Sequence, residues 1–127
     1  MLLRRTTITL AVVTFALATA AQQSSGFVGQ WLGNVDGIGE AKLIVTAVRA
    51  DGRIEGRMEF ALQSYVSTFG DKADSVRNTN RGVVSGSTLA IDAALGGTYR
   101  LTLSGDGLAG TYTRGTTFSG SAIFKRQ

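Results

Sequence analysis

The fold is indicated by a stretch near the middle of the chain, Ala50-Asp51-Gly52-Arg53-Ile54-Glu55-Gly56-Arg57-Met58. A second stretch has the same form, Gly105-Asp106-Gly107-Leu108-Ala109-Gly110-Thr111-Tyr112. In each, the turn dipeptide Asp-Gly precedes a strand that alternates and contains a glycine. Asp-Gly between alternating apolar runs is a strong hairpin signal, because glycine adopts the positive φ of a tight turn without steric cost. The two stretches predict a meander of antiparallel strands.

Alternation of apolar and polar side chains continues through most of the chain and indicates about eight strands. The expected strands are residues 27–35, 42–49, 53–62, 82–86, 88–95, 98–104, 108–114 and 117–125. In the third and fifth strands the side chains expected to point inward are Ile54, Met58, Phe60 and Leu62, then Leu89, Ile91, Ala93 and Leu95. Frequent turn signals between short strands are typical of an all-β sandwich or barrel.

Two features favour a barrel over a sandwich. The short links imply sequential hairpins, whereas sandwiches usually need Greek-key crossings. Glycines inside the expected strands, Gly56, Gly86, Gly110 and Gly120, permit the sharp coiling that a small closed barrel requires. Closure also removes exposed strand edges. We therefore expect a single eight-stranded antiparallel up-and-down β-barrel.

The first twenty residues have the layout of a secretory signal peptide. Arg4 and Arg5 precede an uncharged apolar run over 8–17, and Ala18-Thr19-Ala20 has the small-x-small form of a cleavage site. A permanent N-terminal anchor is the alternative, but the run is short for a membrane span. We expect residues 1–20 to be a signal peptide and residues 21–127 to be one domain, exported to the periplasm or the extracellular space, with no membrane span after cleavage.

Composition restricts the possible chemistry. The chain has no histidine and no cysteine, which excludes catalytic triads, thiolate catalysis and His- or Cys-based zinc sites. Without disulfides the domain must be stabilised by its own core. The basic residues are scattered singly among acidic ones rather than gathered in a stripe, and loss of Arg4 and Arg5 lowers the net charge of +4, so nucleic acid is not an expected partner.

The remaining acidic residues give no catalytic or metal motif. Glu55 and Glu59 share the outer face of their strand, which indicates surface solvation rather than a glycosidase pair. The polar residues Asp71, Asp74, Asn78 and Asn80 lack the spacing of a calcium loop. We expect no enzymatic activity, no cofactor and no metal site.

The opening of the expected domain, Phe27-Val28-Gly29-Gln30-Trp31, resembles the Gly-x-Trp start of calycins, the superfamily of lipocalins, fatty-acid-binding proteins and avidins. In that superfamily a basic residue near the end of the last strand packs across the tryptophan. The resemblance implies barrel closure by Trp31 with Lys125 or Arg126. The first hairpins, through Met58, are also similar to those of bacterial avidins.

The avidin function is not carried over with this resemblance. Avidins line their biotin site with several tryptophans, whereas this chain has only Trp31. The Asn and Tyr that follow the first tryptophan in avidins are replaced by Leu32 and Gly33. The resemblance concerns the scaffold, and a cation–π contact at Trp31 would add about 1 kcal/mol to closure.

Two functions remain. The first is non-catalytic binding of a small apolar ligand inside the barrel, with room left by Ala93, Gly110, Gly120 and Ala122. The candidate ligand-binding residues are aromatic: Phe60, Tyr65, Tyr99, Tyr112 and Phe118. The second is an interaction or accessory module with a packed core, of the kind attached to secreted hydrolases, which acts through its outer surface or residues 63–80. Ligand identity and oligomeric state stay open.

Residues 63–80 form the longest expected connection and interrupt the alternation. Long connections in compact domains are often functional or mobile. The alternative is an ordinary hairpin loop in which Tyr65 and Phe69 cover the barrel mouth.

Overall fold

The computed structural model describes residues 26–72, 77, 79 and 81–127. These residues form eight strands: β1 (Gly29–Val35), β2 (Gly39–Val48), β3 (Ile54–Phe60), β4 (Val83–Ser85), β5 (Thr88–Asp92), β6 (Thr98–Ser104), β7 (Gly107–Arg114) and β8 (Phe118–Arg126). The short helix α2 (Gln63–Ser67) and the 3-10 helices η1 (Gly70–Lys72) and η2 (Ala94–Gly96) complete the described elements. The expected signal peptide, residues 1–20, lies outside the described residues.

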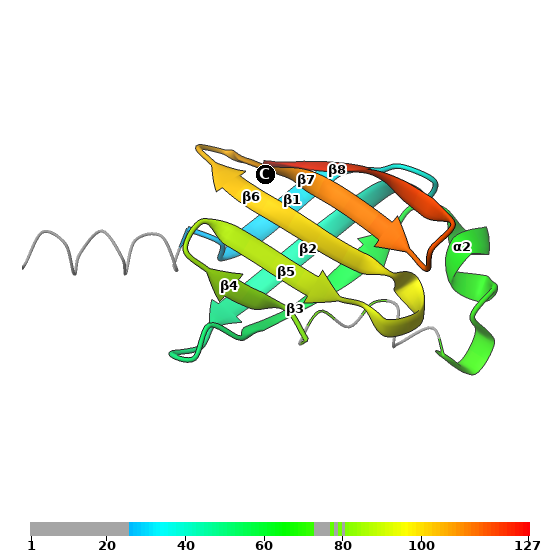
Figure 1. The fold of residues 1–127 in the computed structure, drawn as a ribbon, viewed down its shortest axis with the longest axis horizontal. Coiled ribbons are helices and arrows are strands. Elements are labelled where there is room, and N and C mark those ends of the chain that lie inside the picture. The colour runs from blue at the N-terminus through cyan, green and yellow to red at the C-terminus, as the bar shows by residue number, and fades with distance from the viewer. Residues whose placement is uncertain (1–25, 73–76, 78, 80) are drawn as a thin grey trace, which may run out of the picture.

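The strands form one antiparallel sheet in the order β3-β2-β1-β8-β7-β6-β5-β4. Consecutive strands pair with each other except β3 and β4, which are the two ends of the sheet order, and β1 pairs with β8 to bring the two ends of the domain together (Figure 1). The sheet curls until β3 approaches β4. There Arg53 and Val83 form a bridge, supported by a 2.7 Å hydrogen bond from the Val84 amide to the Gly52 carbonyl. The predicted all-β, up-and-down eight-stranded barrel is confirmed, as a nearly closed barrel.

The barrel has two distinct ends. The N-terminal entry to β1, the β2–β3, β4–β5 and β6–β7 turns and the end of β8 lie at one end. The β1–β2 and β7–β8 turns, α2 and η2 lie at the other, which is on the right in Figure 1. Because α2 follows β3 directly and buries Tyr65 and Val66, it packs against the core at this second end.

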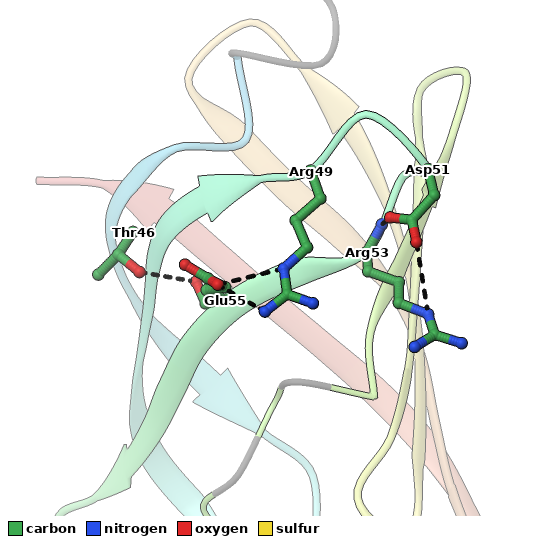
Figure 2. Close-up of polar contacts among 5 residues, drawn as sticks. All are labelled: Thr46, Arg49, Asp51, Arg53 and Glu55. Atoms are coloured by element: carbon green, nitrogen blue, oxygen red, sulfur yellow. Dashed lines mark hydrogen bonds and ion pairs between the residues drawn. The ribbon is translucent and has the colours of Figure 1, made fainter.

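The stretch over 50–58 forms the turn between β2 and β3. Gly52 has a φ of +90°, and the Arg49 amide donates to the Arg53 carbonyl across the turn. A bulge in β2 between Val45 and Ala47 lets the Thr46 hydroxyl donate to the Glu55 carbonyl at 3.0 Å. Figure 2 shows Arg49 turned towards Glu55 and Asp51 towards Arg53.

The second stretch forms its turn one residue earlier than predicted. Ser104 pairs with Gly107, so the two turn residues are Gly105 and Asp106. The positive φ, +57°, belongs to Gly105 and not to Gly107, which is the first residue of β7. A two-residue hairpin with glycine at its first central position matches the strand twist equally well.

The internal glycines allow close approach between strands. A Cβ on Gly110 would overlap the backbone carbonyl of Arg100, and one on Gly56 would overlap the carbonyl of Ile44. These two positions therefore accept only glycine without displacing a neighbouring strand. Gly86 has a different role from the one predicted, because it lies in the β4–β5 turn with a φ of +60°.

The core fills the middle of the barrel. Its largest side chains expose less than 2% of their surface: Phe27, Trp31, Leu43, Ile54, Met58, Leu89, Ile91, Tyr99, Leu101, Leu108, Tyr112 and Phe124. Two residues predicted to point inward do not. Leu62 and Leu95 are 51% and 52% exposed, because β3 ends at Phe60 and β5 ends at Asp92 before the alternation of the sequence does.

Candidate functional site

The five aromatic residues predicted to bind a ligand lie at one end of the barrel. Phe60 is the last residue of β3, Tyr65 belongs to α2, and Tyr99 is the second residue of β6. Tyr112 lies near the end of β7, and Phe118 begins β8. We call this group, together with Arg114, the tyrosine end.

The aromatic rings pack in two rows. The Phe60 and Tyr65 centroids lie 4.8 Å apart, and those of Tyr65 and Phe69 lie 5.3 Å apart, both in edge-on arrangements. Tyr112 lies 4.8 Å from Tyr99 and 6.0 Å from Phe118. These separations are those of favourable aromatic pairs. The tyrosine end therefore contains two groups of packed rings, contributed by four strands and α2.

The three tyrosine hydroxyls differ in their hydrogen bonding. The Tyr112 hydroxyl donates to the Gly96 carbonyl at 2.6 Å, which ties β7 to the β5–β6 connection. The hydroxyls of Tyr65 and Tyr99 are buried, and neither has a partner with hydrogen-bond geometry in the part of the chain that the structure describes, although Tyr112 and Arg114 are polar neighbours of the Tyr65 hydroxyl. Buried tyrosine hydroxyls usually have a partner, so two unpaired ones at one barrel end require an explanation.

The surroundings also change the pKa values of Tyr65 and Tyr99. Burial raises the pKa of Tyr65, and the nearby Tyr112 raises it further, whereas Arg114 lowers it. Burial likewise raises the pKa of Tyr99, with smaller contributions from Tyr112 and Tyr65. Both groups are therefore neutral at physiological pH and available as hydrogen-bond donors.

Arg114 is the one charged residue of the tyrosine end. Its guanidinium carbon lies 5.8 Å from the centroid of the Phe118 ring, which is the range of a cation–π contact. The side chain is half-buried, and Arg114 takes part in none of the ion pairs formed by the described residues. Sequence reasoning missed this residue, although the alternation that places Leu108 and Tyr112 inward also reaches Arg114.

The β5–β6 connection borders the tyrosine end and carries a strained residue. Ala94 has a φ of +51°, which is uncommon for a residue other than glycine. The Asp92 carboxylate holds it by accepting from the Ala94 amide at 3.0 Å, and it also accepts from Arg81 at 2.9 Å. This arrangement positions the Gly96 carbonyl that receives the Tyr112 hydroxyl.

Trp31 and Arg126 meet towards the other end of the barrel. The guanidinium of Arg126 lies 4.2 Å from the Trp31 ring centroid, and it donates to the carbonyls of Gly26 and Val28. The Trp31 indole nitrogen donates to the Phe27 carbonyl at 3.1 Å. Of the two basic residues proposed for this contact, the structure places Arg126 on the ring, whereas Lys125 is exposed on the outer face of β8.

The four small residues expected to leave room in the barrel have close neighbours or lie in the core. The place of a side chain on Gly110 is taken by the Arg100 backbone, and that of Gly120 by the side chain of Asp36. Ala93 and Ala122 are themselves buried in the core. These four positions therefore do not by themselves identify space for a ligand.

A second candidate surface lies on the outside of β1, β2 and β3. It is a shallow groove of about 360 Å³, lined by Leu32, Glu40, Ala41, Lys42, Glu59, Phe60, Ala61 and Gln127. Leu32 is 39% exposed there, and Ile123, on the neighbouring strand β8, is 61% exposed.

Several predictions concern residues that the structure does not place. The side chains of Asp71, Asp74, Asn78 and Asn80 lie outside the described part, as does most of the segment over 73–80. Among the described residues, no three acidic, histidine or cysteine side chains gather as a possible metal site. Within the same residues, no helix has the length and hydropathy needed to cross a membrane.

No protein-family model matches the chain, and no curated protein matches it significantly. The architecture, eight antiparallel strands in a nearly closed barrel with Arg126 on Trp31, is compatible with a calycin-like fold.

Proposed function

We propose that this protein binds a small molecule without chemical turnover, at the tyrosine end of its barrel. The observation that carries the proposal is the pair of buried hydroxyls, on Tyr65 and Tyr99, that lack a partner among the described residues. A buried hydroxyl without a partner destabilises the folded state by about 1–3 kcal/mol, so a bound molecule that accepts from both would stabilise the protein.

The surroundings suit a ligand that is mainly apolar. Phe60, Phe69 and Phe118 supply ring surface, and the exposed Leu62 and Leu95 belong to segments that flank this end. Ligand sites commonly combine an apolar lining with a few convergent polar groups. The absence of histidine and cysteine from the sequence is consistent with binding rather than catalysis. The expected signal peptide makes export part of the same proposal.

Helix α2 is the element whose movement would open such a site. It has only five residues and no side-chain N-cap, and a helix this short has little stability of its own. Its buried residues, Tyr65 and Val66, hold it against the barrel. Outward movement of α2 would expose Tyr99 and Tyr112 without unpairing any strand.

Solution NMR of the isotope-labelled protein tests this proposal against an organic extract of the cell envelope from which it is purified. We expect shifts of amide signals from Gly96, Tyr99 and Tyr112. Unchanged signals at these residues, with an extract that binds elsewhere or not at all, would contradict ligand binding at the tyrosine end.

The second candidate is an interaction module. It is favoured by the filled middle of the barrel and by the outer groove over β1 to β3, whose lining combines apolar Leu32 with charged Lys42 and Glu59. The same NMR assay discriminates between the two, because a protein partner on the groove would shift Leu32, Lys42 and Glu59 and leave Gly96, Tyr99 and Tyr112 unchanged.

A further inference from the structure

The tyrosine end has more hydrogen-bond donors than acceptors. Tyr65 and Tyr99 are 8% and 1% exposed, and their hydroxyls have no partner among the described residues. The neighbouring Tyr112 hydroxyl already donates to Gly96, so its proton is not available to them. The Tyr112 oxygen can still accept one hydrogen bond, and Arg114 is a donor without a lone pair, so this group has more O–H and N–H donors than acceptors.

The positive charge of Arg114 also favours a ligand that accepts hydrogen bonds. Arg114 lies near the Tyr65 hydroxyl, and the ion pairs of the described chain involve other arginines: Arg49, Arg53, Arg81 and Arg126. A guanidinium beside two neutral O–H donors favours a planar anion that can accept several hydrogen bonds at once.

The aromatic rings of the tyrosine end favour a ligand whose anionic group is attached to a flat aromatic ring. Tyr99, Tyr112 and Phe118 form a continuous row with centroids 4.8 and 6.0 Å apart, and Phe60 and Tyr65 add a second pair of rings at 4.8 Å. An aromatic ligand presents edges and faces to such rings in the offset and edge-on geometries that they prefer.

We infer that the tyrosine end takes a small aromatic carboxylate, whose oxygens accept from the Tyr65 and Tyr99 hydroxyls and face the Arg114 guanidinium. This inference deepens the proposed function and rests on it. Because Tyr65 belongs to α2 and Tyr99 to β6, one bound carboxylate links the helix to the barrel wall and holds α2 closed.

Isothermal titration of the intact purified protein with matched probes tests the inference. The probes are benzoate and phenylacetate, with benzamide and phenylacetamide as neutral partners of the same shape. We expect each carboxylate to bind at least about tenfold more tightly than its amide, since hydrogen bonds to charged groups exceed those to neutral groups by about that factor.

Three variants assign the effect to residues. Tyr99→Phe and Tyr65→Phe each remove one hydroxyl and keep the ring, and Arg114→Gln removes the charge. Each is expected to weaken benzoate binding by about tenfold, and Arg114→Gln is expected to leave benzamide binding unchanged. Arg100→Gln is the matched control, because Arg100 is exposed on the outer face of β6. Circular dichroism establishes that each variant is folded.

The outcomes separate this inference from the proposed function. Equal affinity for benzoate and benzamide, both reduced in Tyr99→Phe, would overturn the carboxylate assignment and leave a ligand site at the tyrosine end. No binding of any probe would overturn the inference even if the envelope extract shifts the same NMR signals. No binding of the probes and no response to the extract would overturn both.

Discussion

Tyr99 and Tyr112 have adjacent rings, but only the Tyr112 hydroxyl makes a hydrogen bond among the described residues. Removing each hydroxyl in turn therefore tests what the unpaired one does to stability. Tyr112→Phe loses the hydrogen bond to Gly96 and is expected to lower the free energy of unfolding by about 1 kcal/mol. Tyr99→Phe removes a hydroxyl that has no partner among the described residues, so stability is expected to stay the same or rise by up to about 1 kcal/mol. Urea unfolding of ligand-free protein measures both, and a loss of stability in Tyr99→Phe would show that its hydroxyl is paired.

Arg126 and Lys125 form a second matched pair. Arg126 stacks on Trp31 and donates to two carbonyls of the segment that enters β1, whereas Lys125 is exposed. Arg126→Gln is expected to lower the free energy of unfolding by about 2 kcal/mol, from the lost cation–π contact and hydrogen bonds. Lys125→Gln is expected to change it by less than about 0.5 kcal/mol. Equal thermal shifts in the two variants would refute a closing role for Arg126.

The residue types in the candidate site were largely readable from the sequence, but their pairing was not. Period-two alternation places Tyr99 and Tyr112 inward, and the register then brings them opposite each other. Which hydroxyl finds the Gly96 carbonyl depends on the φ of Ala94, which no local pattern indicates. The sequence likewise left Lys125 and Arg126 as alternatives, because one residue of register decides which faces Trp31.

At the scale of the elements, Gly110 tests how tightly β6 and β7 coil. A Cβ there would overlap the Arg100 carbonyl, so Gly110→Ala must displace a strand and is expected to lower the free energy of unfolding by about 2 kcal/mol or more. Gly107 on the same strand is the control, because a Cβ there would meet its nearest neighbour, the Ser104 carbonyl, at 3.5 Å. Gly107→Ala should cost under about 1 kcal/mol, and similar losses in both variants would argue against close approach at Gly110.

Helix α2 is expected to be the least stable described element at the tyrosine end. Hydrogen exchange of the ligand-free protein should be faster for the amides of 63–67 than for those of β6 and β7, because a short helix opens without unfolding the sheet. Mass spectrometry of deuterated peptides measures this difference. Equal protection of α2 and the central strands would exclude the helix as a gate.

Elements were predicted well where alternation and turn chemistry agree, and poorly where the chain leaves the sheet. The expected strand over 98–104 has the bounds of β6, and β1, β7 and β8 differ from prediction by two residues or fewer at each end. Leu62 and Leu95 continue an apolar alternation beyond the last hydrogen-bonded pair, so the pattern overran β3 and β5. Five residues are too few to show a helical period, which is why α2 was not predicted.

For the whole molecule, the buried tyrosines predict how stability depends on pH. Tyr65 and Tyr99 have raised pKa values in the folded state, with burial as the main cause. Above a pH of about 10 the unfolded chain releases these protons and the folded chain keeps them, so stability should fall by about 1.4 kcal/mol per pH unit for each tyrosine. Below that pH the two residues contribute no pH dependence.

Urea unfolding between pH 9 and about 11.5 measures this slope. The variant Tyr65→Phe/Tyr99→Phe lacks both groups and should lose stability less steeply over the same range. Equal slopes in the two proteins would mean that other groups cause the alkaline loss.

In the whole molecule, one end of the barrel is closed by Trp31 and Arg126, and the tyrosine end is the proposed ligand site. Arg126 on Trp31 secures the entry to β1, the middle of the barrel is filled, and two hydroxyls without described partners lie at the tyrosine end. Native mass spectrometry of protein taken directly from the cell envelope is the most direct test of ligand binding at the tyrosine end. The wild-type protein is expected to retain a small molecule, and Tyr65→Phe/Tyr99→Phe, folded to the same extent, is expected to have lost it. A wild-type mass without any retained molecule, or the same molecule retained by both proteins, would contradict ligand binding at the tyrosine end.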